Sequence, residues 1–184
     1  MQIKVKIDWP PQLIGEKRRI VATAAVAALR DTAAASVQEG RRNIGAAGPG
    51  FTRAKWQSGL QYLTKDAKTE GGEASLQAKA IIFHKYGIAG VFEHGATIQG
   101  KPMLWIPTEH GAPTASRSGK KLVSATVRGK PMLFDAADRD PHRKPLYIGV
   151  PSVRIPKKFR IAEIVKEHVK QFWQAFAKHF KDNK

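Results

Sequence analysis

Three short stretches of the chain share one pattern, in which a basic residue and a proline precede a run of apolar residues. Because proline has no N–H to donate to a central sheet ladder, it usually lies at the first residue of a strand or on an edge strand. We therefore expect the three stretches to start three similar strands of one sheet. They are too short and too unevenly spaced to form a solenoid. The stretches are GKPMLWIP at 100–107, GKPMLFDA at 129–136 and RKPLYIGVP at 143–151.

The N-terminal part of the chain changes from a strand pattern to a helix pattern. Ile3, Val5 and Ile7 alternate with polar residues, which predicts a strand with one solvated face. Over residues 15–42, small apolar residues recur at spacings of three and four without an intervening proline, which predicts a long helix. The apolar stripe is mainly alanine, so this helix can approach a sheet or another helix closely while burying little area per turn.

The middle of the chain is predicted to contain short elements and one long loop. Residues 108–121 lack periodicity and are rich in Gly, Ser, Thr and Pro, so we expect a mobile basic loop over about 108–128. The elements predicted before it are a short helix or turn at 52–57, a strand up to residue 65, a hairpin tip at 70–73, a strand at 76–83 and a short helix or turn at 86–94.

The last predicted element is an amphipathic helix over residues 161–180. Its apolar residues form one helical face, and we expect Phe172, Trp173 and Phe176 to lie in the core. Lys157 and Lys158 come immediately before its start, where the helix dipole disfavours cations. Either an anionic partner or solvation of the two lysines would relieve that conflict.

Length and composition indicate one domain spanning residues 1–184. A chain of 184 residues can bury one core and is short for two. It contains no cysteine, which excludes disulfides and cysteine-ligated metals. No apolar run approaches the roughly 20 residues that a membrane helix needs, and the first residues lack the layout of a signal peptide. We expect a soluble protein with no membrane partner.

The sequence contains no recognisable catalytic motif. It lacks a P-loop, a GxGxxG turn, a GxSxG elbow and an HExxH helix, and its six histidines are scattered. Glu93 and His94 are the one acid–histidine pair in a glycine-bounded position where a metal site or acid–base catalysis could arise. No second carboxylate or histidine stands at a recognisable spacing from them. We therefore expect no enzymatic activity, no cofactor and no metal, and we assign Glu93 and Gly95 to a structural turn.

The chain is strongly basic, with a formal net charge of +17. Residues 101–160 hold 13 lysines and arginines against four acids, a net charge of +9. Such a field attracts polyanions, namely nucleic-acid phosphates, an acidic protein surface or anionic lipid. No helix-turn-helix, zinc finger or aromatic RNA-binding strand motif accompanies it, so sequence-specific readout is not expected.

Several motifs occur in an order that resembles the tail-completion, or head–tail joining, proteins of long-tailed bacteriophages. An alanine-rich helix leads to GPGFTRAKWQSGL at 48–60, and after two predicted strands come VFEHGATI at 91–98, KPMLWIP at 101–107 and a C-terminal helix. The chain is also similar to an uncharacterised phage family from tail-gene clusters. The features shared with that family are the E-x-G-A-x-I segment, the L-W-I-P strand and the late K-P-L…I-P-K-K-F run.

The resemblance implies an α+β subunit in which a small, mostly antiparallel sheet is packed by the long N-terminal helix and the amphipathic C-terminal helix. It implies a virion protein, made in the bacterial host cytoplasm, that forms a ring of six copies in the neck or tail and lets DNA pass. The implied partners are a tail terminator or tail tube protein, head-completion or connector proteins, and packaged DNA. The alternative is a free basic protein that binds nucleic acid without sequence specificity.

Two groups of cations are the candidate contact residues. Lys157, Lys158 and Arg160 are expected to face DNA, because they lie beside a helix start and add to its affinity for anions. The basic loop suits a segment that becomes ordered on docking to a neighbouring protein. Its candidate interface residues are Arg117, Lys120, Lys121 and Arg128.

Overall fold

The structure, a computed structural model of residues 1–184, is α+β with antiparallel sheets, as expected. It describes the chain except residues 9–14, 71–74, 114, 116–117, 141 and 183–184, and except the side chains of residues 66–70 and 75. The described residues form two compact units, Met1–His94 with Lys157–Lys184, and Gly95–Pro156. The second unit is thus inserted into the sequence of the first. The sequence indicates one domain and does not predict this division.

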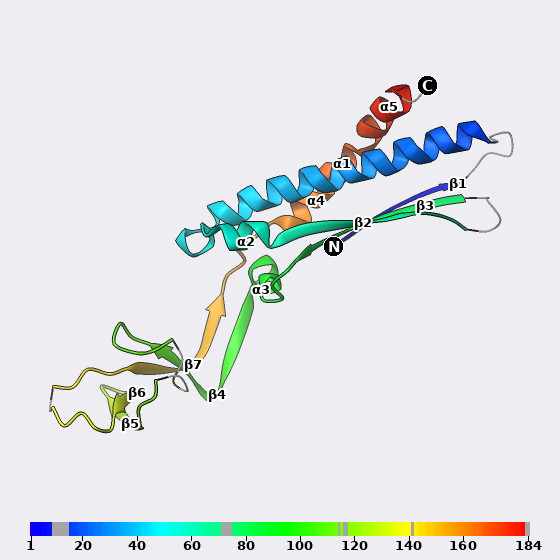
Figure 1. The fold of residues 1–184 in the computed structure, drawn as a ribbon. Helices are drawn as coiled ribbons and strands as arrows, with labels where there is room; N and C mark the ends of the chain where they lie inside the picture. Colours follow the sequence, from blue (N-terminus) through cyan, green and yellow to red (C-terminus); the bar gives the residue numbers. More distant parts are fainter. Residues whose placement is uncertain (9–14, 71–74, 114, 116–117, 141, 183–184) are drawn as a thin grey trace. The chain divides into compact units, whose positions relative to one another are not determined.

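The first unit combines a three-stranded antiparallel sheet with helices (Figure 1). Its elements are β1 (Gln2–Asp8), α1 (Glu16–Ala46), a 3₁₀ helix (Pro49–Phe51), α2 (Ala54–Ser58), β2 (Leu60–Glu70), β3 (Ser75–His84), α3 (Ala89–His94), α4 (Ile161–Lys170) and α5 (Phe172–Asp182). The strand order is β1–β3–β2, and α1 lies along one face of the sheet. α4 and α5 also pack against α1. Most of the predicted hairpin tip lies outside the described residues.

The alanine stripe of α1 permits the close packing that its composition predicts. Ala24, Ala25, Ala28 and Ala33 are fully buried. A Cβ atom on Gly40 would lie 2.5 Å from Leu60 Cδ2 of β2 and 3.2 Å from Cδ1 of Ile161 at the start of α4. By length and composition α1 could also cross a membrane. Its buried face is nevertheless part of the core of this unit, and core helices commonly meet the same criteria.

The expected last helix is two helices, because α4 ends at Lys170 and α5 begins at Phe172. Phe172 is buried, and Phe176 is half-buried against the core, as expected. The prediction for Trp173 is wrong, since 63% of this residue is exposed. Successive residues of a helix are about 100° apart around its axis, so burial of Phe172 leaves the adjacent Trp173 at the edge of the apolar face.

The second unit is a four-stranded antiparallel sheet. Its strands are β4 (Ala96–Pro107), β5 (Leu122–Val127), β6 (Lys130–Asp135) and β7 (Tyr147–Ile155), in the order β4–β7–β6–β5. The three proline-containing stretches contribute to β4, β6 and β7, which are neighbours in this one sheet, as expected. Pro131 is the second residue of β6, and Pro145 lies two residues before the first residue of β7. Pro102 lies inside β4, where the register shifts between Gln99 and Leu104, so no regular ladder bond is lost there.

The basic loop is shorter than the sequence indicates. Leu122–Val127 forms β5 and pairs with β6, and Arg128 and Gly129 form the turn between the two strands. This segment alternates in a way that the loop prediction missed, because Val123, Ala125 and Val127 supply a weak two-residue period. Between β4 and β5 remain residues 108–121, of which 114, 116 and 117 are not described.

Candidate functional site

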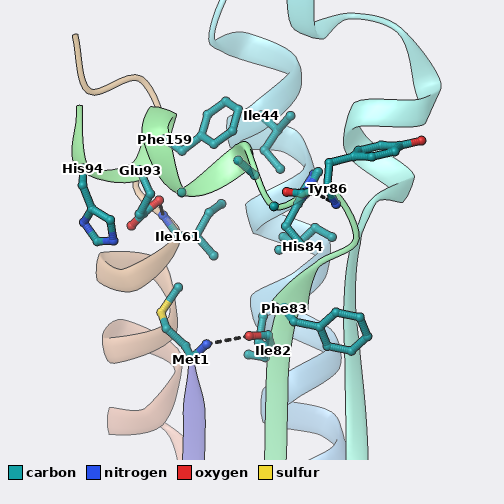
Figure 2. Close-up of a pocket in the computed structure, with 14 residues that line it drawn as sticks. Met1, Ile44, Ile82, Phe83, His84, Tyr86, Glu93, His94, Phe159 and Ile161 are labelled. Carbon is teal, nitrogen blue, oxygen red and sulfur yellow. Dashed lines mark hydrogen bonds between the residues drawn. The ribbon is translucent and has the colours of Figure 1, made fainter. Parts of the chain in front are cut away.

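A pocket of about 330 Å³ in the first unit is the leading candidate for a functional site (Figure 2). α1, the strands β2 and β3, α3 and the start of α4 all contribute to its lining. The lining is mostly apolar, with four side chains able to take part in acid–base or hydrogen-bond chemistry. These four are His84, Tyr86, Glu93 and His94.

Glu93, the last residue but one of α3, binds the first turn of α4. Its Oε2 accepts a hydrogen bond from the backbone N–H of Ile161 at 2.9 Å, and its Oε1 accepts one from Ala162 at 2.8 Å. In Figure 2 the carboxylate is directed toward Ile161. Gly95 follows with φ of 75°, a conformation that glycine adopts without steric penalty. Glu93 therefore caps α4 from within α3, and Gly95 links α3 to β4.

The backbone N–H groups at the start of α4 donate hydrogen bonds to side chains from elsewhere in the same unit. The backbone N–H of Arg160 donates to Oδ1 of Asn43 in α1 at 2.9 Å, next to the two N–H groups that Glu93 binds. These three donors are among those that a helix leaves without an intrahelical partner. A carboxylate is also favoured there by the helix dipole. The protein itself thus supplies a carboxylate at the helix start that follows Lys157 and Lys158.

His84 is held by backbone groups on both sides of its ring. Nδ1 lies 3.1 Å from the backbone nitrogen and 3.3 Å from the carbonyl oxygen of Tyr86, and Nε2 lies 2.9 Å from the carbonyl oxygen of Trp56. A Cβ on Gly59 would lie 2.7 Å from Cε1 of His84, which accounts for the glycine at that position. His84 therefore fixes the approach of α2 to the end of β3.

An aromatic cluster around Phe51 packs the 3₁₀ helix, α2, α3 and the segment before α4 against one another. Phe51 makes edge contacts with Trp56, Phe92 and Phe159 at centroid distances of 5.3, 4.8 and 5.1 Å. The backbone N–H groups of Lys158 and Phe159 both donate to the carbonyl oxygen of Phe92, at 2.7 and 2.9 Å. The segment before α4 is therefore fixed against α3 by packing as well as by hydrogen bonds.

Two of the four polar side chains of the pocket are engaged in structural contacts. Glu93 accepts two N–H groups and His84 is held by two backbone groups, which leaves Tyr86 and His94, both exposed. Among the residues that the structure describes, no group of three or more histidines, cysteines or carboxylates is placed to hold a metal ion. The described contacts of Glu93 are those of a helix cap, and His94 is exposed beside it.

The three cations expected to face DNA lie together, but two of them are engaged. Lys157 Nζ and Arg160 Nε contact the two carboxylate oxygens of Glu163, each at 2.7 Å. The hydrogen bond from Lys157 and then that from Arg160 lower the pKa of Glu163 to about 2. Lys158 lies with its Nζ 5.4 Å from the centroid of the Phe51 ring, a cation–π geometry. The cluster carries less free positive charge than its sequence indicates.

The expected interface residues in the second unit have different surroundings. Lys120 Nζ forms an ion pair with Oδ2 of Asp135 at 2.8 Å. The hydrogen bond with Lys120 lowers the pKa of Asp135, and the same bond raises the pKa of Lys120. Lys121 is exposed and bonds through its carbonyl oxygen to the backbone N–H of Ala136. Arg128 is exposed in the β5–β6 turn with φ of 50°, and Arg117 lies outside the described residues.

Comparison with known proteins gives no further assignment, since no protein-family model, curated protein or solved structure matches the chain.

Proposed function

We propose that this chain is a structural subunit of a tailed-bacteriophage virion, a tail-completion, neck or minor tail protein. It is made in the host cytoplasm and assembles as a ring that helps to join tail to head and lets DNA pass. Its partners are further copies of itself, a tail terminator or tail tube protein, head-completion or connector proteins, and packaged DNA. The motif order of the sequence suggests the family, and the surface of the first unit supports an assembly role.

The exposure of Trp173 is the observation that carries this proposal. Trp173 is 63% exposed, although the rings of Phe172 and Phe176 lie 5.2 and 5.6 Å from its own and restrict its orientation. Val169, 39% exposed, adds an apolar side chain one turn earlier. A rigid tryptophan in an otherwise basic, solvated helix is the kind of residue that dominates the binding energy of protein interfaces. Glu93 and His84 of the pocket, in contrast, are engaged in contacts that hold the fold together.

Complementation of a phage that lacks a functional copy of this gene tests the proposal. We expect Trp173→Ser to leave filled heads and tails made but unjoined, or tails of aberrant length, as counted by negative-stain electron microscopy. Ile88→Ser is the matched control, because Ile88 is 56% exposed on another part of the same unit. The control should give normal infectious particles.

Stability measurements separate assembly from folding. Phe172 is 5% exposed, so Phe172→Ala should lower the free energy of unfolding by about 3–5 kcal/mol, whereas Trp173→Ser should change it little. Normal particles from Trp173→Ser, or absence of the protein from purified virions by mass spectrometry, would contradict the proposal.

A further inference from the structure

The strand register of the first unit places three lysines side by side across its sheet. Lys4 of β1 is paired with Lys79 of β3, and Lys79 is paired on its other side with Lys65 of β2. Neighbouring strands are about 4.8 Å apart, so the backbone positions of the three lysines span about 10 Å. We call Lys4, Lys79 and Lys65 the lysine row.

The alternation of side chains along the strands places the lysine row on the face of the sheet opposite α1. Side chains alternate between the two faces of a strand, and the neighbours Ile3, Ala78 and Ala80 are buried in the core with α1. Lys4 and Lys65 are exposed and Lys79 is half-buried. The row is therefore on the solvated side of the sheet.

None of the three lysines has an acidic partner among the side chains that the structure describes. The nearby Lys6 differs in this respect, because its Nζ lies 3.1 Å from Oδ1 of Asp8. Like charges directly opposite one another destabilise a sheet. An arrangement of three unpaired lysines in register is thus unfavourable for the isolated subunit, and an anionic ligand would relieve it.

We propose that the lysine row binds the phosphate backbone of duplex DNA without sequence specificity. Duplex DNA carries one negative charge per roughly 1.7 Å of its axis with both strands counted, or one per roughly 3.4 Å along each strand, so about three phosphates of one strand lie along a span of about 10 Å. Lysine ammonium groups act as point charges toward phosphates and carry no base readout by themselves. Lys157 and Arg160, the cations that the sequence favours for this contact, are already held by Glu163.

This inference deepens the proposed function and rests on it for the reason that the subunit would meet DNA. The evidence for the surface itself is independent, because it comes from the strand register. Apolar residues beside the row, Leu63 and Ile81, are paired with each other on the same face. An acidic protein partner would bury those apolar side chains, whereas a duplex would contact the lysines alone.

The test measures binding of the purified full chain to a fluorescently labelled DNA duplex of random sequence, by anisotropy over a salt series. One variant carries Lys4→Gln, Lys65→Gln and Lys79→Gln. The matched control carries Lys17→Gln, Lys166→Gln and Lys178→Gln, which remove the same charge from exposed positions on α1, α4 and α5. Thermal melts at low salt check folding, and the row variant should be no less stable than the wild type, because it relieves like-charge repulsion.

The logarithm of the association constant falls linearly with the logarithm of the salt concentration. If the row contacts three phosphates, its removal should make this slope less steep by about 2.7. The wild type should then lose about 40-fold more affinity than the row variant between about 50 and 200 mM salt. The control variant should keep a slope within one unit of the wild type. A wild-type slope in the row variant, or equal losses in both variants, would overturn the inference.

The outcomes distinguish this inference from the proposed function. A chain that binds duplex DNA through the row but never enters virions contradicts the proposed function alone. A chain that enters virions, and whose row variant binds DNA with the wild-type slope, contradicts the DNA-binding surface alone. Tighter binding of single-stranded DNA that is lost in Phe83→Ala would also overturn the duplex assignment, because Phe83 is the exposed aromatic on β3.

Discussion

The carboxylate of Glu93 accepts the backbone N–H of Ile161, 68 residues further along the chain, at 2.9 Å. This bond and its neighbour to Ala162 join the end of α3 to the start of α4, on either side of the inserted second unit. The acid that the sequence marks as the best catalytic candidate is thus a helix cap. A carboxylate in this position satisfies two backbone donors that α4 itself cannot pair.

Glu93→Ala should therefore destabilise the first unit without any effect that depends on a substrate or a metal. We expect a loss of about 1–3 kcal/mol in the free energy of unfolding, because two buried or half-buried N–H groups lose their acceptor. Glu93→Gln, which keeps one oxygen acceptor, should lose less. Urea denaturation followed by circular dichroism measures all three proteins.

His94→Ala is the control for this prediction, because His94 is exposed beside the same pocket. Its stability should stay within about 0.5 kcal/mol of the wild type. Equal stabilities of Glu93→Ala and His94→Ala would show that the cap contributes nothing. A hydrolase or nuclease activity that both substitutions abolish would instead restore the catalytic interpretation.

The ion pairs of Glu163 make a pH-dependent contribution to stability. Lys157 and Arg160 lower the pKa of Glu163 from its ordinary value of 4.5 to about 2 in the folded protein. Because the folded pKa lies below the unfolded one, the contribution is fully present above about pH 4.5 and is lost as the pH falls toward 2. The melting temperature of Glu163→Gln should therefore lie below that of the wild type at pH 6 and approach it near pH 2.

Salt provides the check on this cause. The charged groups are exposed, so ions should screen their attraction, and the difference between the two melting temperatures at pH 6 should shrink at high ionic strength. A difference that is unchanged by both pH and salt would mean that Glu163 stabilises α4 through its helix propensity rather than through its charge.

Local patterns predicted most elements, while the features of the site depend on contacts between distant residues. The alternation of Ile3, Val5 and Ile7 and the alanine period before residue 42 gave β1 and α1 within a few residues, because each element's period is visible in its own sequence. No local signal links Glu93 to Ile161. The lysine row likewise needs the register of three strands, which the sequence of one strand does not specify.

The error at Trp173 comes from treating every apolar residue of the last helix as part of one buried face. Phe172, Trp173 and Phe176 all lie in α5, where successive residues are about 100° apart around the axis. Burial of Phe172 therefore leaves its neighbour Trp173 at the edge of that face. The assignment of residues 108–128 to a loop failed because glycine and serine content outweighed the short alternation of β5.

The turn between β5 and β6 gives the last prediction. Val127 is paired with Lys130, so Arg128 and Gly129 form a two-residue turn, and their φ angles of 50° and 76° match the type I′ turn typical of tight hairpins. Asparagine and glycine adopt the first position of this turn readily, whereas an L-residue such as arginine is disfavoured there by roughly 1 kcal/mol. Arg128→Asn should therefore stabilise the second unit by about 0.5–1 kcal/mol.

Hydrogen exchange of the β5 and β6 amides measures this effect locally, and Arg128→Ala is the control, because it removes the charge and keeps a strained side chain. Equal stabilisation by both substitutions would assign the effect to charge instead of backbone conformation. Backbone strain that a common substitution would remove suggests that the native residue has a function. In the proposed ring, Arg128 presents a cation at the tip of a hairpin, so Arg128→Asn should give a more stable subunit that joins heads to tails less efficiently.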